Sequence, residues 1–112
     1  MFLKTMTVLV RNKRNSEGSG WLKKWEEYMH CTANECAVCG ERLTKDQRNG
    51  AHVYKVHRDS ETGRYVASEE GKYYIVPLCK KHNNSENTEV MEVDEELLVE
   101  EEILRFAQND KE

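Results

Sequence analysis

Hydrophobic and polar positions along the 112-residue chain follow two periods, one helical and one extended. The helical period lies between residues 21 and 29, where lysines and glutamates occupy one face. The opposite face carries the apolar side chains Trp21, Leu22, Trp25, Tyr28 and Met29. This spacing predicts an amphipathic helix that is capped by Ser19 or Gly20 and that turns its tryptophans toward the core.

The extended period predicts an antiparallel hairpin in the middle of the chain. Residues 51–57 predict one strand, and residues 73–76 predict a second strand that Pro77 stops. Gly-containing polar turns separate the two, and the hairpin gains a third strand if residues 64–67 pair with it. Residues 89–93 predict another short strand.

Two helices are predicted in the last third of the chain. A short one begins at residues 78–82 and ends in the polar run that follows. A longer one has Asp94 as its N-cap and is rich in glutamate. Its apolar contacts are Leu97, Leu98, Ile103, Leu104 and Ala107. The elements together predict a small α+β protein.

The charge of the chain is divided along its length. Residues 1–84 carry 15 Lys and Arg against 10 Asp and Glu, about +5, whereas residues 85–112 carry 2 against 11, about −9. A basic body suits a polyanion such as DNA or RNA, which the acidic segment would oppose or shield until a partner displaces it. A solvated acidic helix with no binding role explains the same pattern.

Four residues with metal-ligand spacing form two pairs, Cys36-x2-Cys39 and Cys79-x2-His82. Zn²⁺ prefers four thiolate or imidazole ligands in a tetrahedron, and residues separated by two others can reach one ion. The pairs flank the predicted hairpin, and Gly40 can take the positive φ that a tight turn after Cys39 requires. We therefore expect one structural Zn²⁺ whose loss unfolds the body.

Two alternatives to this ligand set stay open. Cys31 could replace Cys36 or Cys39, or the cysteines could be free and buried. The order of cysteine turn, hairpin and short helix is that of a treble-clef zinc finger. We divide the chain into an N-terminal strand and mobile arm (residues 1–20), a treble-clef domain preceded by the tryptophan helix (residues 21–99), and the end of the acidic C-terminal helix with its tail (residues 100–112).

The motifs resemble those of zinc-containing HNH, or His-Me finger, nucleases over roughly residues 21–99. The matching segments are Cys36-x2-Cys39, Gly50-Ala51-His52-Val53 and Ile75-Val76-Pro77-Leu78-Cys79-x2-His82-Asn83. The Trp-Leu-x2-Trp helix ahead of them is similar to that of small uncharacterised bacterial zinc proteins.

The resemblance implies a role for two further residues. His52 matches the family's general base, and Asn83 stands where a histidine binds the catalytic divalent ion. Some members of the superfamily use an oxygen ligand there, so the resemblance implies that Mg²⁺ binding is weakened but not lost. Tyr74 falls near the position of the asparagine that orients the base, and Ala51 replaces a frequent acid. The implied catalytic set is incomplete.

Five cations are candidates for phosphate contacts because they lie at the hairpin tip or beside the zinc ligands: Arg58, Arg64, Lys72, Lys80 and Lys81. Three functions remain open. They are a nucleic-acid-binding domain with a degenerate nuclease site, an active Mg²⁺-dependent endonuclease, and a zinc-stapled module that binds a protein partner through its C-terminal helix.

The chain carries no feature that predicts export or membrane insertion. Its first residues lack the basic region and cleavage site of a signal peptide, and no run is long enough to span a bilayer. Cysteines in CxxC-type pairs fit metal binding in a reducing compartment. We expect a cytoplasmic protein without membrane contacts.

Overall fold

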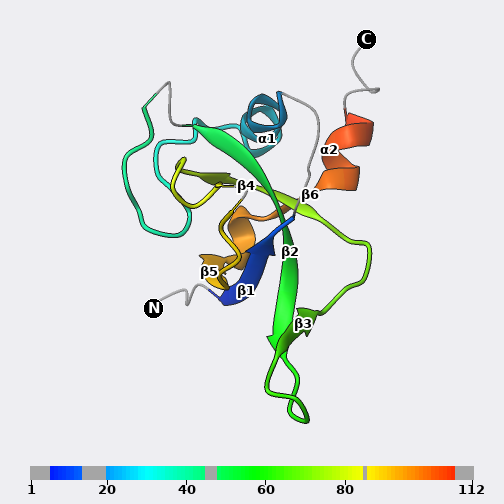
Figure 1. Cartoon of the computed structure of the whole chain (residues 1–112). Helices are drawn as coiled ribbons and strands as arrows, with labels where there is room; N and C mark the ends of the chain where they lie inside the picture. Colours follow the sequence, from blue (N-terminus) through cyan, green and yellow to red (C-terminus); the bar gives the residue numbers. More distant parts are fainter. Residues whose placement is uncertain (1–5, 14–19, 45–47, 85, 108–112) are drawn as a thin grey trace, which may run out of the picture.

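A computed structural model describes residues 6–13, 20–44, 48–84 and 86–107, which form an α+β domain with a curled antiparallel sheet (Figure 1). In chain order its elements are β1 (Thr7–Asn12), α1 (Trp21–Met29), β2 (Asn49–Arg58), β3 (Tyr65–Ala67), β4 (Tyr74–Leu78), β5 (Met91–Asp94), the 3-10 helix η1 (Glu95–Leu97), β6 (Val99–Glu100) and α2 (Glu101–Ala107). The predicted fold class is confirmed at this level.

The sheet has the strand order β5-β1-β2-β4-β6, and all pairs in it are antiparallel. The predicted hairpin is present as β2 and β4, with His52 opposite Ile75. β1 lies between β2 and β5, with Val10 opposite Lys55 on one side and Met91 on the other. Segments from both ends of the chain therefore build one sheet.

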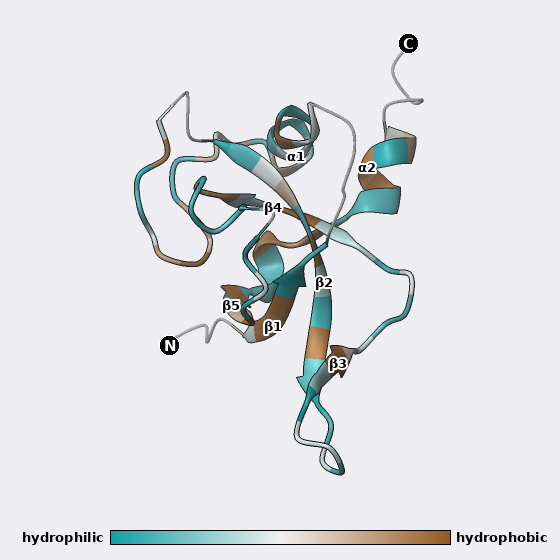
Figure 2. Cartoon of the chain, in the orientation of Figure 1, coloured by the Kyte–Doolittle hydropathy of each residue, from teal (hydrophilic) through white to brown (hydrophobic). Residues whose placement is uncertain are grey.

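β2 extends beyond the body of the sheet and pairs there with β3, where His57 lies opposite Val66. These two strands and the turn between them form an arm, residues 56–67, that projects from the body (Figure 1). The Asp59 carboxylate closes the turn by accepting hydrogen bonds from the Thr62 amide and hydroxyl at 3.2 and 2.8 Å. Residues at the tip are mostly hydrophilic (Figure 2).

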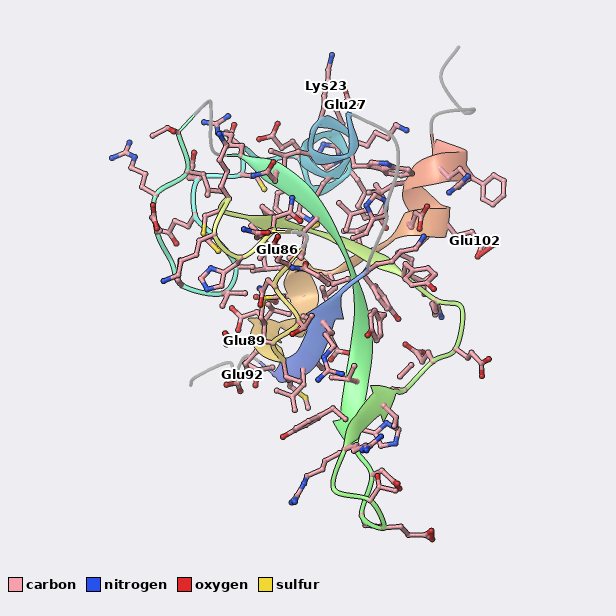
Figure 3. The ribbon with its side chains drawn as sticks, in the orientation of Figure 1. Lys23, Glu27, Glu86, Glu89, Glu92 and Glu102 are labelled. Atoms are coloured by element: carbon pink, nitrogen blue, oxygen red, sulfur yellow. The ribbon has the colours of Figure 1, made fainter. Side chains whose placement is uncertain are left out.

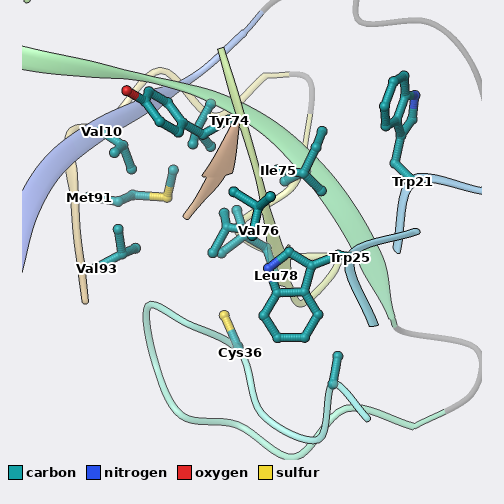
Figure 4. Packing of buried hydrophobic residues seen from close by; sticks show 14 of the residues in the cluster. Val10, Trp21, Trp25, Cys36, Tyr74, Ile75, Val76, Leu78, Met91 and Val93 are labelled. Carbon is teal, nitrogen blue, oxygen red and sulfur yellow. The ribbon is translucent and has the colours of Figure 1, made fainter. Parts of the chain in front are cut away.

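The core joins the sheet to α1 and α2, because it includes Trp21, Trp25 and Leu104 beside the buried strand residues. Figure 4 shows the two tryptophans with buried residues of the strands. Both tryptophans of α1 are buried, as their helical spacing predicts, and the Trp25 indole N–H donates to the Leu97 carbonyl at 2.9 Å. α1 begins directly against β2, because a Cβ built on Gly50 would lie 2.6 Å from the Leu22 nitrogen. A glycine at this position therefore lets helix and strand backbones meet.

Pro77 does not stop its strand, which continues to Leu78. The expectation was wrong because a proline removes only one amide donor from a strand. The pairing of β6 with β4 involves Tyr74 and Ile75, which precede Pro77, so it does not need that donor. The Pro77 carbonyl still accepts a hydrogen bond from the Ala37 amide at 3.0 Å. All five residues of β4 are buried.

The expected helix from Asp94 is divided into η1, β6 and α2. Asp94 precedes η1, but its side chain makes no capping hydrogen bond there. Leu98 is extended (φ −85°, ψ 126°), and Val99 then pairs with Ile75 of β4. Sheet pairing and burial therefore override the helical preference of the glutamates in this segment. The side chain of Ala107 lies outside the described part.

Residues 80–83 form a hydrogen-bonded turn rather than the expected short helix. The amides of His82 and Asn83 both donate to the Cys79 carbonyl, at 3.1 and 2.9 Å. The mobile arm expected within residues 11–20 falls mainly on residues 14–19, which lie outside the described residues, while Arg11 and Asn12 belong to β1.

Candidate metal centre

Four side chains from two distant segments converge at one end of the sheet. The ligand atoms of Cys36, Cys39, Cys79 and His82 all lie within 4.8 Å of one another. The Cys79 sulfur is 3.2 Å from His82 Nδ1 and 4.0 Å from the Cys39 sulfur. Tetrahedral Zn²⁺ with bonds of about 2.3 Å holds its sulfurs about 3.8 Å apart, so these separations fit a single ion.

The first ligand pair lies in a tight turn. The Gly40 amide donates to the Cys36 carbonyl at 2.9 Å, and Gly40 has φ 75°, as the sequence predicted. The Val38 amide lies 3.4 Å from the Cys36 sulfur and points a backbone N–H at it. The turn is held at its base by the Cys36 amide, which donates to the Glu41 carbonyl at 2.9 Å.

The second ligand pair follows β4 directly. Cys79 comes after the fully buried Leu78, so the strand register fixes its position. The His82 carbonyl accepts hydrogen bonds from the side-chain amides of Asn12 at 2.6 Å and Asn87 at 2.9 Å. A strand from the start of the chain and a loop after the site therefore both hold the turn that carries His82.

Burial and backbone hydrogen bonds act in opposite directions on the thiols. Burial by itself raises the pKa of Cys36, but amide hydrogen bonds from Cys39, Cys79 and Val38 outweigh it and lower the pKa. The pKa of Cys39 is raised, first by burial and further by the neighbouring Cys36. A cation between the sulfurs would offset this repulsion, because metal binding requires thiolates.

Cys31, the alternative ligand, is exposed and does not belong to this group of four in the described part of the chain. An ion held by two buried and two accessible ligands of this set would have all four tetrahedral positions filled by protein. Such a centre leaves no position for a reactive water, so its chemistry is that of a structural site.

His52, the candidate general base, is buried, with 5% of its surface exposed. Its ring meets the Trp21 ring edge to face at a centroid distance of 5.0 Å, and its Nε2 lies 3.9 Å from a Glu101 carboxylate oxygen. Burial lowers the pKa of His52; Glu101 opposes this effect, and Lys13 and Arg105 add to it. Burial therefore favours the neutral form of the His52 imidazole.

Asn83, the candidate second-metal ligand, is half-buried, and its backbone N–H donates to the Cys79 carbonyl. Within the described residues it makes no hydrogen bond with His52. The structure thus brings together the four metal ligands, whereas His52 packs against Trp21 and faces Glu101.

The five candidate phosphate contacts occupy three places. Arg58 and Arg64 lie at the arm. Lys80 and Lys81 lie in the metal-site turn, beside the opposite end of β2. The two ends of β2 are about 30 Å apart at about 3.3 Å per residue. Lys72 is in neither group, because it pairs with Glu100 at 2.9 Å and with Glu69 at 3.9 Å.

Sequence reasoning missed the cluster around His52. Trp21, Glu101 and Arg105 come from α1 and α2, and the Glu101 carboxylate also pairs with Arg105. No local pattern indicates this contact, because residues 52 and 101 are far apart in sequence and come together through the pairing of β6 with β4.

Comparisons of the chain with models of protein families, with curated proteins and with solved structures find no match. In the part of the chain that the structure describes, no helix has the length and apolar character needed to cross a bilayer.

Proposed function

We propose that this chain is a zinc-stabilised nucleic-acid-binding domain, related to the HNH nucleases through a treble-clef-like arrangement but without a working catalytic site. Cys36, Cys39, Cys79 and His82 hold the Zn²⁺. Support for a structural role comes from the closed donor set and from the direct connection between β4 and Cys79. The ion would supply folding free energy on the order of 10 kcal/mol.

The observation that carries nucleic-acid binding is the projecting arm. A two-stranded β-ribbon fits the major groove of DNA, which is about 12 Å wide. Arg58 and Arg64 lie at the two ends of the tip turn, and both are exposed. Arg58 uses its Nε to hold the Gly63 carbonyl at 3.3 Å, which leaves four N–H donors of the guanidinium for phosphate or base edges.

The burial of His52 supports binding without cleavage. A general base must come within hydrogen-bond reach of the attacking water. Here Trp21 and the first turn of α2 cover the imidazole. An active endonuclease that uses His52 and Asn83 with Mg²⁺ would need α2 to move away.

The test is the affinity of the zinc-loaded chain for duplex DNA and for structured RNA, measured by fluorescence anisotropy between about 20 and 200 mM salt. We expect binding that weakens with salt, and a slope that falls by about 2 in the Arg58→Ala, Arg64→Ala double variant. The matched control is Lys23→Ala, on the exposed outer face of α1 (Figure 3).

Each other outcome has a definite meaning. Wild-type protein that shows no salt-dependent binding at low salt contradicts the proposal. Binding that the double variant retains places the nucleic acid elsewhere, with Lys80 and Lys81 as the next pair to replace. Mg²⁺-dependent cleavage that is lost in His52→Ala would show a working nuclease and would contradict the degenerate site.

A further inference from the structure

A groove lies between the C-terminal end of α1 and the segment from η1 to α2, on a different part of the molecule from the arm. It has a volume of about 300 Å³ and is called the α1–α2 groove below. Met29, Leu98 and Ile103 are among its apolar lining residues. Two large side chains at this groove are unusually accessible, since Tyr28 is 47% exposed and Ile103 39% exposed.

The same groove is acidic. Glu95, Glu96 and Glu100 line it, against a single lining lysine, Lys55. Lys55 pairs with Glu95 at 3.1 Å, and Lys72 outside the groove pairs with Glu100 at 2.9 Å. Among the described residues Glu96 has no ion-pair partner, and it is exposed. The groove thus combines apolar lining residues with more carboxylates than lysines.

These features favour one kind of occupant. A phosphate backbone would meet like charge in the groove and would be repelled. An arginine or lysine could lay its aliphatic stem on Met29 and Ile103 while its charged end meets Glu96 and the face of Tyr28. A neighbouring aliphatic side chain on the same segment would fill the apolar remainder of the groove.

We propose that the α1–α2 groove binds a segment of a partner protein in which Lys or Arg alternates closely with aliphatic residues. Charge complementarity selects the cation, and exposed Tyr28 and Ile103 supply the apolar contact. This proposal does not depend on nucleic-acid binding by the arm.

The experiment selects displayed random 12-residue peptides on the immobilised, zinc-loaded full chain. We expect enrichment of peptides that carry Lys or Arg next to Leu, Ile or Met. The best selected peptide, made synthetically, should bind about tenfold more weakly to Glu96→Lys and to Ile103→Ser. Matched controls are Glu61→Lys and Val66→Ser on the arm, where Val66 is 41% exposed, close to Ile103.

Three results would overturn the proposal. They are selection that enriches no basic–aliphatic peptide, selected peptides that bind both groove variants as well as wild type, and self-association in sedimentation that either groove variant abolishes. The last would make a second copy of the chain the occupant. Circular dichroism of each variant checks that these exposed substitutions leave the fold intact.

Discussion

The imidazole of His52 faces the carboxylate of Glu101 at 3.9 Å, which joins the middle of β2 to the first residue of α2. Trp21 closes the same space from α1. The charged groups that face His52 are Glu101, Lys13 and Arg105, and only the first favours a protonated ring. This contact packs α2 against the sheet, although α2 follows the last strand in the sequence.

The burial of His52 predicts a pH dependence of stability. Because burial lowers its pKa in the folded state, the unfolded chain binds the proton first as pH falls. The stability is therefore complete above the ordinary histidine pKa of about 6.5 and is lost as pH falls from there through the lower folded value. The free energy of unfolding of His52→Gln should fall less steeply than that of wild type between about pH 7 and 5.

Urea unfolding at several pH values, with zinc content measured at each, checks this prediction. The zinc ligands also bind protons in acid, so only the difference between variant and wild type is informative. His57→Gln, on the exposed part of β2, is the matched control for the loss of one imidazole. Equal slopes for His52→Gln and wild type would contradict a buried neutral imidazole.

Replacement of Glu101 predicts a further shift of the same group. The Glu101 carboxylate raises the pKa of His52 against the effect of burial. Glu101→Gln removes that charge, so the pKa of His52 should move still lower. NMR titration of the histidine ring signals measures it directly. An unchanged or higher value in the variant would mean that the two side chains do not face each other in solution.

Loss of one metal ligand should unfold the body. Zinc binding contributes on the order of 10 kcal/mol, which compares with a net stability of about 5–15 kcal/mol for a whole domain. Cys79→Ser should therefore lose the bound zinc and cooperative thermal unfolding together. Cys31→Ser changes an exposed cysteine outside the cluster and should retain both. Metal analysis and near-ultraviolet circular dichroism give the two readouts.

Complete chelation provides an independent form of this test. Wild-type protein that keeps its near-ultraviolet spectrum and its unfolding temperature after all zinc is removed would rule out a structural role for the ion. Recovery of both signals on adding Zn²⁺ back is the result that we expect.

Gly50→Ala should weaken the packing of α1 on β2. The added Cβ would lie 2.6 Å from the nitrogen and 2.9 Å from the Cα of Leu22, and these backbone atoms cannot rotate away. Overpacking of this kind costs about 1–3 kcal/mol. Chemical denaturation measures the loss, with Ser60→Ala on the exposed arm turn as the control. A variant as stable as wild type would mean that α1 can shift.

Local patterns predicted some parts of this molecule correctly. The helix between residues 21 and 29 follows from its apolar spacing, and the positive φ of Gly40 follows from the tight cysteine turn. The proximity of the two ligand pairs was predictable because each pair is local and the hairpin between them returns the chain. These predictions needed only neighbouring residues or one strand pairing.

Other features depend on partners far along the chain. The segment after Asp94 has helical composition, yet Val99 pairs with Ile75 and breaks the helix. The burial of His52 depends on Trp21 and Glu101, which lie on separate helices. Neither fact leaves a periodic signal in the sequence, because tertiary pairing decides between local alternatives of similar energy.

The arm places exposed side chains apart from the buried residues that stabilise the fold. Nearly all side chains from His57 to Ser68 are exposed, and the turn is closed by its own hydrogen bonds between Asp59 and Thr62. Substitutions at the tip therefore disturb neither the buried sheet nor the metal ligands. The chain can acquire a different binding preference by mutation in this one segment without a compensating change in the core, which makes the arm the natural place for evolutionary divergence or for grafted sequences.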